Sequence, residues 1–302
     1  MSAPSASTAA AAPERILRRL DWKVIRRLDG ALQGDYSTLF YGAGVDLSDL
    51  REYQPQDDIR HIDWNVTARM NRLHVRQYLE DRELTTWFLL DLSRSMRFGG
   101  AERNKHTVLV EFVGVMARLL TRGGNRVGAI LYDTHTTRSI PARTGRNQVL
   151  RLLHDLLRQA DRPGRGRTDL KVLLYAALGA LKRRSLLFVV SDFISEPGWQ
   201  RPLSLLGHRH ELVTIRVWDP RESQLPSTGF VYIEDAETGE QIAVDTGDPI
   251  FRRNLAALAA RNEADLRTAL TRASTDPHSI STEDDLGRAI LRMAALRKKR
   301  RR

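Results

Sequence analysis

The sequence has 302 residues and a formal net charge of +11 at pH 7, with 41% hydrophobic and 28% charged residues. These proportions are ordinary for globular proteins, so they argue against a disordered chain and against a fibrous repeat. Cysteine is absent, which excludes disulfides, a thiolate zinc site and a cysteine nucleophile. Any metal must therefore be bound by oxygen atoms or imidazole rings.

The apolar runs and the two ends of the chain indicate where in the cell the protein is expected. No apolar run approaches the roughly 18 to 20 residues that cross a bilayer. Residues 1–14 lack the basic start and apolar core of a secretory signal, so we expect a disordered lead-in and a cytoplasmic protein. Residues 297–302 are all basic, and such a run is typically a solvated tail.

The first predicted element is an amphipathic helix over residues 15–28, where apolar residues recur at helical spacing among basic ones. Gly30 and Gly34 end it. Residues 34–84 have a short, irregular pattern that predicts an extended, partly β lead-in packed on the following domain. Within this lead-in, residues 42–69 carry dense opposite charges. We expect a structural collar there, to which Trp64 would contribute stability if its ring is buried.

The middle of the chain alternates apolar strands with amphipathic helices. Strands are predicted at residues 86–93, 126–132, 185–191 and 211–218. Helices are predicted at residues 102–120, 147–157 and 170–182 and near residues 203–206. This alternation implies right-handed βαβ crossovers. The predicted fold class is therefore α/β, with a doubly wound, mainly parallel sheet.

The pattern changes after Pro226. Residues 229–236 and 240–246 predict a β-hairpin, followed by helices over residues 249–273 and from residue 283 into the basic tail. The expected domain organisation is a lead-in with a short helix (1–33), the partly β lead-in (34–84), the α/β core (85–222), a hairpin with helices that completes the domain (223–296), and the tail (297–302).

The residues that could carry chemistry follow the predicted strands. Asp91 ends the first core strand and begins the pattern Asp91, Ser93, Ser95. In open α/β sheets, ligands bind at the carboxyl ends of the strands. Mg²⁺ prefers about six oxygen ligands at roughly 2.1 Å, which this loop alone does not supply. Thr168, at a glycine-rich turn, and Asp192, directly after another strand, are expected at the same edge.

The sequence DLSRSM, with a later TDL and a strand-terminal SDF, resembles the von Willebrand factor A domain with its metal-ion-dependent adhesion site. The resemblance implies that Asp91, Ser93, Ser95 and Thr168 are ligands or near-ligands of Mg²⁺ or Mn²⁺, and that Asp192 holds a coordinated water. It also implies a function, in which an acidic side chain of a partner protein completes the coordination of the metal.

Residues 42–83 resemble the signature of the bacterial family catalogued as domain of unknown function 58. The matching positions are Gly42, Gly44, Leu50, Arg51, Tyr53, Pro55, Asp57, Asp58, Arg60, Ile62, Asp63, Trp64, Ala68 and Arg69. The resemblance runs from about residue 34 to the tail and is to a short form, without the membrane helices and additional β-domain of longer members. It implies a MoxR-type AAA+ ATPase as partner, with this chain as adaptor in chaperone-like remodelling.

The residues around the motif argue against a catalytic function. No activated nucleophile or general base accompanies the motif, and a haloacid dehalogenase-like phosphotransferase would need an aspartate where Ser93 stands. The sequence thus predicts binding rather than catalysis. A basic nucleic-acid-binding protein without a functional metal site remains the alternative. In that case Ser93 and Ser95 would only cap the next helix and Asp192 would only close a turn.

Two further features are interpreted as structural. His61 and Asp63, in the sequence HIDW, have no further ligand at metal-binding spacing, so they are expected to support the fold. His208 and His210 are expected at the surface beside a strand. The turn PGRGRT lacks the lysine of a phosphate-binding loop.

Overall fold

The computed structural model describes residues 6–32, 49–55, 57, 59, 62–77, 85–134, 136–160, 166–234, 239–273 and 275–300. Its centre is a six-stranded sheet. The strands are β3 (Thr85–Asp91), β4 (Arg126–Asp133), β5 (Thr136–Arg143), β6 (Leu186–Ser191), β7 (Glu211–Trp218) and β10 (Asp276–Ser281). Their order across the sheet is β10-β7-β6-β3-β4-β5, and only β5 runs antiparallel to its neighbour. The predicted α/β class with a mainly parallel sheet is confirmed.

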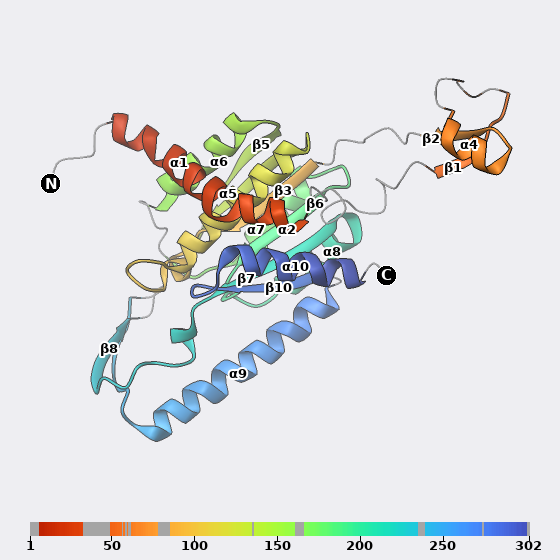
Figure 1. Cartoon of the computed structure of the whole chain (residues 1–302). Helices are drawn as coiled ribbons and strands as arrows, with labels where there is room; N and C mark the ends of the chain where they lie inside the picture. Colours follow the sequence, from red (N-terminus) through yellow and green to blue (C-terminus); the bar gives the residue numbers. More distant parts are fainter. Residues whose placement is uncertain are drawn as a thin grey trace.

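Helices cover both faces of this sheet (Figure 1). The helices on one face are α1 (Ala6–Leu20), α2 (Arg26–Leu32), α5 (Lys105–Arg122), α6 (Arg146–Ala160) and α10 (Leu286–Arg300). The other face is covered by α7 (Leu170–Ala180), α8 (Gln200–Arg209) and the last turns of α9 (Pro249–Arg272). Within the described part of the chain, no helix is long and apolar enough to cross a membrane.

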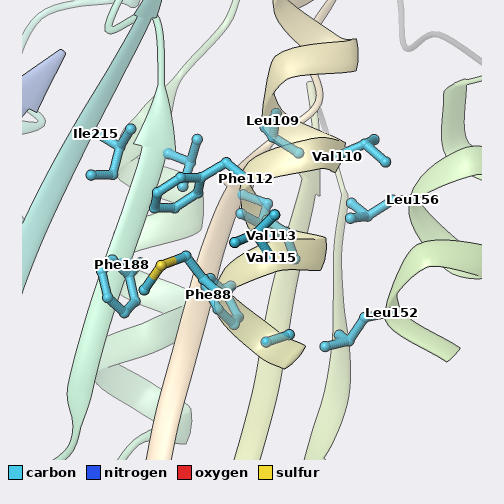
Figure 2. Packing of buried hydrophobic residues seen from close by; sticks show 14 of the residues in the cluster. Phe88, Leu109, Val110, Phe112, Val113, Val115, Leu152, Leu156, Phe188 and Ile215 are labelled. Atoms are coloured by element: carbon cyan, nitrogen blue, oxygen red, sulfur yellow. The ribbon is translucent and has the colours of Figure 1, made fainter. Parts of the chain in front are cut away.

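The central strands explain why the sheet is buried on both faces. Every residue of β6 is buried, and successive side chains alternate between the two apolar clusters, with Phe188 on one side and Val189 on the other. Figure 2 shows Phe88 and Phe188 from the sheet packed against Phe112 of α5. The rings of Phe88 and Phe188 stack with centroids 5.5 Å apart.

The N-terminal helix is longer than predicted but presents the predicted face. It extends from Ala6 through a π-helical turn, Asp21–Ile25, to Leu32. Leu17 and Leu20 are buried in the cluster that also contains α5 and α6. Gly114 of α5 permits this contact, since a Cβ there would lie 2.9 Å from Leu20 Cδ1. The predicted disordered lead-in is therefore helical from Ala6 onward, and residues 1–5 lie outside the described residues.

The family-signature region contains a small unit that is described by itself. Its antiparallel strands are β1 (Asp49–Glu52) and β2 (His74–Gln77), with α4 (Trp64–Met70) between them. Asp63 is buried and its carboxylate accepts a hydrogen bond from the backbone of Val66, a structural role as predicted. Trp64, by contrast, is 68% exposed. The linking residues 33–48 and 78–84, and His61, lie outside the described residues, so the packing of this region on the main domain stays a prediction.

The predicted hairpin is present as β8 (Phe230–Glu234) and β9 (Gln241–Asp245), which pair antiparallel. The next helix is α9, which Asp248 caps by accepting a hydrogen bond from the backbone of Ile250. The basic tail differs from its prediction at Arg297. This residue belongs to α10, is buried, and forms an ion pair with Glu211. It lies on the helix face that also buries Ile290 and Met293, which explains why it is not solvated.

His210 also differs from the prediction of a surface residue. It is buried at the point where α8 ends and β7 begins, whereas His208, two residues earlier, is exposed. Burial lowers the pKa of His210, and the positive charge of Arg209 adds to the effect.

Candidate metal centre

The two predicted carboxylates lie at the ends of neighbouring strands. Asp91 is the last residue of β3, and Asp192 directly follows Ser191, the last residue of β6. Because β3 and β6 are parallel neighbours, with Leu90 paired to Val190, both carboxylates reach the same carboxyl edge of the sheet. Both are almost completely buried.

The loop after β3 brings two hydroxyl groups to Asp91. The backbone nitrogen of Ser93 donates to Asp91 Oδ1 at 3.0 Å, and the Oγ atoms of Ser93 and Ser95 are 3.1 Å apart. Ser93 precedes the short 3₁₀ helix η3 (Arg94–Arg97), yet its side chain makes no capping hydrogen bond. Its hydroxyl therefore interacts with Ser95 rather than with the start of the helix.

Thr168 lies beside the loop that follows Asp192. It is buried, and its backbone oxygen accepts a hydrogen bond from Glu196 N at 2.8 Å. The next residue, Asp169, caps α7, and its backbone nitrogen donates to Tyr132 Oη at 2.8 Å. The structure thus places Asp91, Ser93 and Ser95 in direct contact and ties Thr168 to the segment after Asp192.

Ser191 connects the two carboxylate positions. Its hydroxyl donates to Asp91 Oδ2 at 2.6 Å and accepts from Phe193 N at 2.9 Å. Phe193 has a positive φ of 60°, a conformation that non-glycine residues adopt rarely and that is often found at functional sites. The hydroxyl therefore fixes both Asp91 and the turn after Asp192.

The electrostatics of this edge are those of crowded negative charge. The pKa of Asp91 is raised to about 6, first by burial and then by the nearby charge of Asp192, although hydrogen bonds from Ser191 and Ser93 oppose the shift. A bound cation would favour the charged form of Asp91, because it offsets both the burial and the repulsion.

A buried lysine also contacts this edge. Lys105 Nζ lies 2.6 Å from Asp192 Oδ2 and 2.5 Å from Glu222 Oε1, which belongs to the short helix η4 (Pro220–Glu222) after β7. Burial works to lower the pKa of Lys105, but the charges and hydrogen bonds of Asp192 and Glu222 outweigh it, so that its pKa is raised. Lys105 is therefore charged at neutral pH.

The sequence analysis did not identify Ser191, Lys105 or Glu222. Lys105 had a signal, because it stands on the apolar face of its helix with Leu109 and Phe112, where a charged residue requires a buried partner. Ser191, a polar residue ending an apolar strand beside Asp192, also had one. Glu222 had none.

The donor groups suit a hard divalent cation. No cluster of three or more His, Asp or Glu side chains that could hold a metal is found among the residues the structure describes. The predicted set is of another kind, two carboxylates and three hydroxyls. Neighbouring ligands of an octahedral ion at roughly 2.1 Å lie about 3.0 Å apart, close to the 3.1 Å between the Ser93 and Ser95 hydroxyls. The residues present therefore fit Mg²⁺ or Mn²⁺.

Fold and site together define an α/β protein with a parallel sheet and a buried carboxylate and hydroxyl cluster at its carboxyl edge. The chain belongs to the family described as Protein of unknown function DUF58, whose profile matches residues 49–265. It is 37% identical over 283 residues to an uncharacterized protein of Mycobacterium tuberculosis strain H37Rv, covering 94% of this chain and 89% of the relative. An uncharacterized protein of Mycobacterium avium is 34% identical over 160 residues, covering 53% of this chain and 94% of that protein.

Solved structures with a similar arrangement are more distant. The conserved hypothetical protein BatB from Bacteroides thetaiotaomicron aligns with a TM-score of 0.47 at 12% identity, covering 72% of this chain and 99% of that one. The SpRpn10 VWA domain aligns with a TM-score of 0.38 at 12% identity, covering 69% and 94%. Family membership therefore rests on the sequence matches.

Proposed function

We propose that this protein binds a partner protein through a divalent cation at the carboxyl edge of its sheet, and that it is a binding protein rather than an enzyme. The observation that carries the proposal is the meeting of Asp91, Ser93 and Ser95 beside Asp192, in a buried and negatively charged setting. Buried carboxylates are costly even with Lys105 beside Asp192, and the cluster has the oxygen donors that Mg²⁺ or Mn²⁺ prefers.

Each residue of the cluster would have its own role in holding the cation. Asp91, Ser93, Ser95 and Thr168 would supply oxygen ligands. Asp192 would hold a water of the metal rather than bind it directly, as the resemblance to the adhesion site implies; its two oxygens also accept hydrogen bonds from Lys105 Nζ and from Ile194 N. The ion, Mg²⁺ or Mn²⁺, would supply a positive charge with a coordination position that an Asp or Glu of the partner fills.

The proposed partner is a MoxR-type AAA+ ATPase or a client protein, with the chain as a cytoplasmic adaptor in chaperone-like remodelling. This part of the proposal rests on the resemblance of the signature region to its family. The alternative, a nucleic-acid-binding protein without a functional metal site, is supported by the net charge of +11.

The metal site is tested by titration calorimetry with Mg²⁺. The wild-type protein should show saturable binding that Asp91→Ala abolishes. Asp133→Ala is the matched control, since Asp133 ends the neighbouring strand β4 but accepts a hydrogen bond from Gln159, outside the proposed site. Because an ion that binds only the folded protein adds stability, Mg²⁺ should raise the melting temperature of wild type and control but not of Asp91→Ala. Equal binding by all three proteins would sink the proposal.

Partner binding is tested with a purified MoxR-type ATPase. Capture should require Mg²⁺, be reversed by a chelator, and be lost in Asp91→Ala while Asp133→Ala retains it. Binding of nucleic acid that falls steeply with salt and ignores Mg²⁺, without Mg²⁺-dependent capture of the ATPase, would favour the alternative.

A further inference from the structure

The ammonium group of Lys105 is enclosed at the edge of the candidate metal centre. The side chain is 1% exposed, and its Nζ contacts Asp192 on one side and Glu222 on the other. The charge of Asp192 raises the pKa of Asp91, the first predicted ligand. Lys105 contacts Asp192 and is thereby linked to Asp91 through one intervening side chain. A fixed positive charge therefore stands next to the place where the divalent cation would be held.

Lys105 is held firmly in this position. It is the first residue of α5, its backbone nitrogen donates to Phe98 O at 3.0 Å, and Asn104 caps the helix by accepting from Thr107 N at 2.8 Å. The following turns of α5 are buried in the core. The helix start fixes the backbone of Lys105, and burial with the two ion pairs holds its ammonium, so an incoming cation meets its charge.

Charged groups of both signs meet at this edge. The ammonium of Lys105 contacts the carboxylates of Asp192 and Glu222, and the charge of Asp192 also acts on Asp91, so that this single positive group stands among three carboxylates. Arg216 lines a cavity of about 560 Å³ with Glu222 and forms an ion pair with Glu263 of α9, and its positive charge also interacts with Glu222 and Asp192. A divalent cation would be attracted by these carboxylates, and Lys105 already offsets part of their negative charge.

We propose that Lys105 is a built-in counterion that competes with the divalent cation, so that it stabilises the metal-free site and lowers the affinity for metal. This inference rests on the proposed function and adds its regulation: the site can stay folded without metal and exchange it reversibly. The physical cause is repulsion between two positive charges in a poorly screened interior, where charges a few ångströms apart interact strongly. Lys105 acts through Asp192, so it is a positioning residue and not a ligand.

The test uses two substitutions with opposite expected effects on Mg²⁺ affinity in the full chain. Lys105→Gln keeps a hydrogen-bond donor but removes the charge, so we expect at least about tenfold tighter Mg²⁺ binding by calorimetry. Glu222→Gln removes one of the two negative charges that pair with Lys105, so that its positive charge is offset only by Asp192. We therefore expect roughly three- to tenfold weaker Mg²⁺ binding. Damage to the fold would weaken binding in both variants, so tighter binding in one of them cannot arise from it.

Thermal melting gives a second readout. Lys105→Gln should melt below wild type in a chelator, because the buried Asp192 and the partly buried Glu222 lose their counterion, and Mg²⁺ should raise its melting temperature more than that of wild type. If Lys105→Gln does not fold even with Mg²⁺, Glu222→Gln decides alone: unchanged or tighter binding by that variant overturns the inference.

The outcomes separate this inference from the proposed function. Wild type and Lys105→Gln binding Mg²⁺ with equal affinity would overturn the counterion role and leave the metal site standing. Binding by neither protein would overturn the metal site, and the inference with it. Binding by Lys105→Gln alone would support the counterion role while showing that the wild-type chain does not use the metal.

Discussion

The carboxyl edge of the sheet and the arm formed by β8, β9 and the first half of α9 distribute polar and apolar groups in opposite ways. At the sheet edge the charged groups of Asp91 and Lys105 are enclosed by the fold. In the arm, Phe230 is 82% exposed and Tyr232 is 79% exposed on one face of the hairpin. Charged groups normally stay in water and aromatic groups in the core, so each region departs from the usual distribution. Ion pairs and helix packing stabilise the buried charges at the sheet edge. The exposed aromatic side chains of the arm have little packing around them.

The largest expected contrast compares one phenylalanine from each region. Phe188 is fully buried, stacked on Phe88 and met edge-on by Phe112 with centroids 6.0 Å apart, so Phe188→Ala should lower the free energy of unfolding by about 3 to 5 kcal/mol. Phe230→Ala should change it by less than about 0.5 kcal/mol, because its ring is already in water. Urea unfolding measures both. A comparable loss for Phe230→Ala would mean that the arm is packed in solution and that the contrast is wrong.

The same contrast explains which strands could be predicted. The four predicted core strands are central or next to central, and their burial on both faces requires continuous apolar runs. The two strands that the sequence analysis missed, β5 and β10, are the edges of the sheet. β5 contains Pro141 and β10 contains Pro277, which edge strands tolerate because one side of their backbone makes no hydrogen bonds to the sheet. Their sequences carry too few apolar residues to be distinguished from loops.

The part of the candidate site that lies directly at the ends of strands could be predicted from the sequence. Asp91 and Asp192 were found because each directly follows an apolar run and parallel strands end at one edge. The contact between Lys105 and Asp192 joins residues 87 positions apart and depends on how α5 packs on the sheet. The role of Glu222 depends in addition on the turn after β7. Such contacts arise from tertiary packing, which periodicity along the chain does not encode.

A smaller effect is expected from pH at His210, where an imidazole is buried in the well-packed region. Neither ring nitrogen has a hydrogen-bond partner among the residues that the structure covers, and burial lowers the pKa of this histidine. Its contribution to stability is complete above the ordinary imidazole pKa of 6.5 and is lost as the pH falls toward the lowered value in the folded state, because protonation then favours unfolding.

The measurement is the melting temperature between pH 7.5 and about 5. Wild type should lose stability over this range, and His210→Leu should lose less of it. His208→Leu is the matched control, since His208 is exposed in the same helix end and should leave the pH dependence unchanged. Identical pH profiles for wild type and His210→Leu would show that the imidazole is solvated rather than buried.

The smallest effect is expected at Trp64, which extends the comparison to the unit formed by β1, α4 and β2. Like the aromatic residues of the arm, Trp64 exposes most of its ring, so Trp64→Ala should change the free energy of unfolding by less than about 0.5 kcal/mol. Asp63→Ala, one residue earlier, removes the carboxylate that caps α4 and should cost about 1 kcal/mol of local stability. Hydrogen exchange of the α4 amides, together with melting of the full chain, distinguishes the effects of the two substitutions.

A loss of about 2 kcal/mol or more for Trp64→Ala would mean that its ring is buried against the rest of the protein. Unchanged melting with weakened capture of the ATPase would instead place Trp64 in the partner interface.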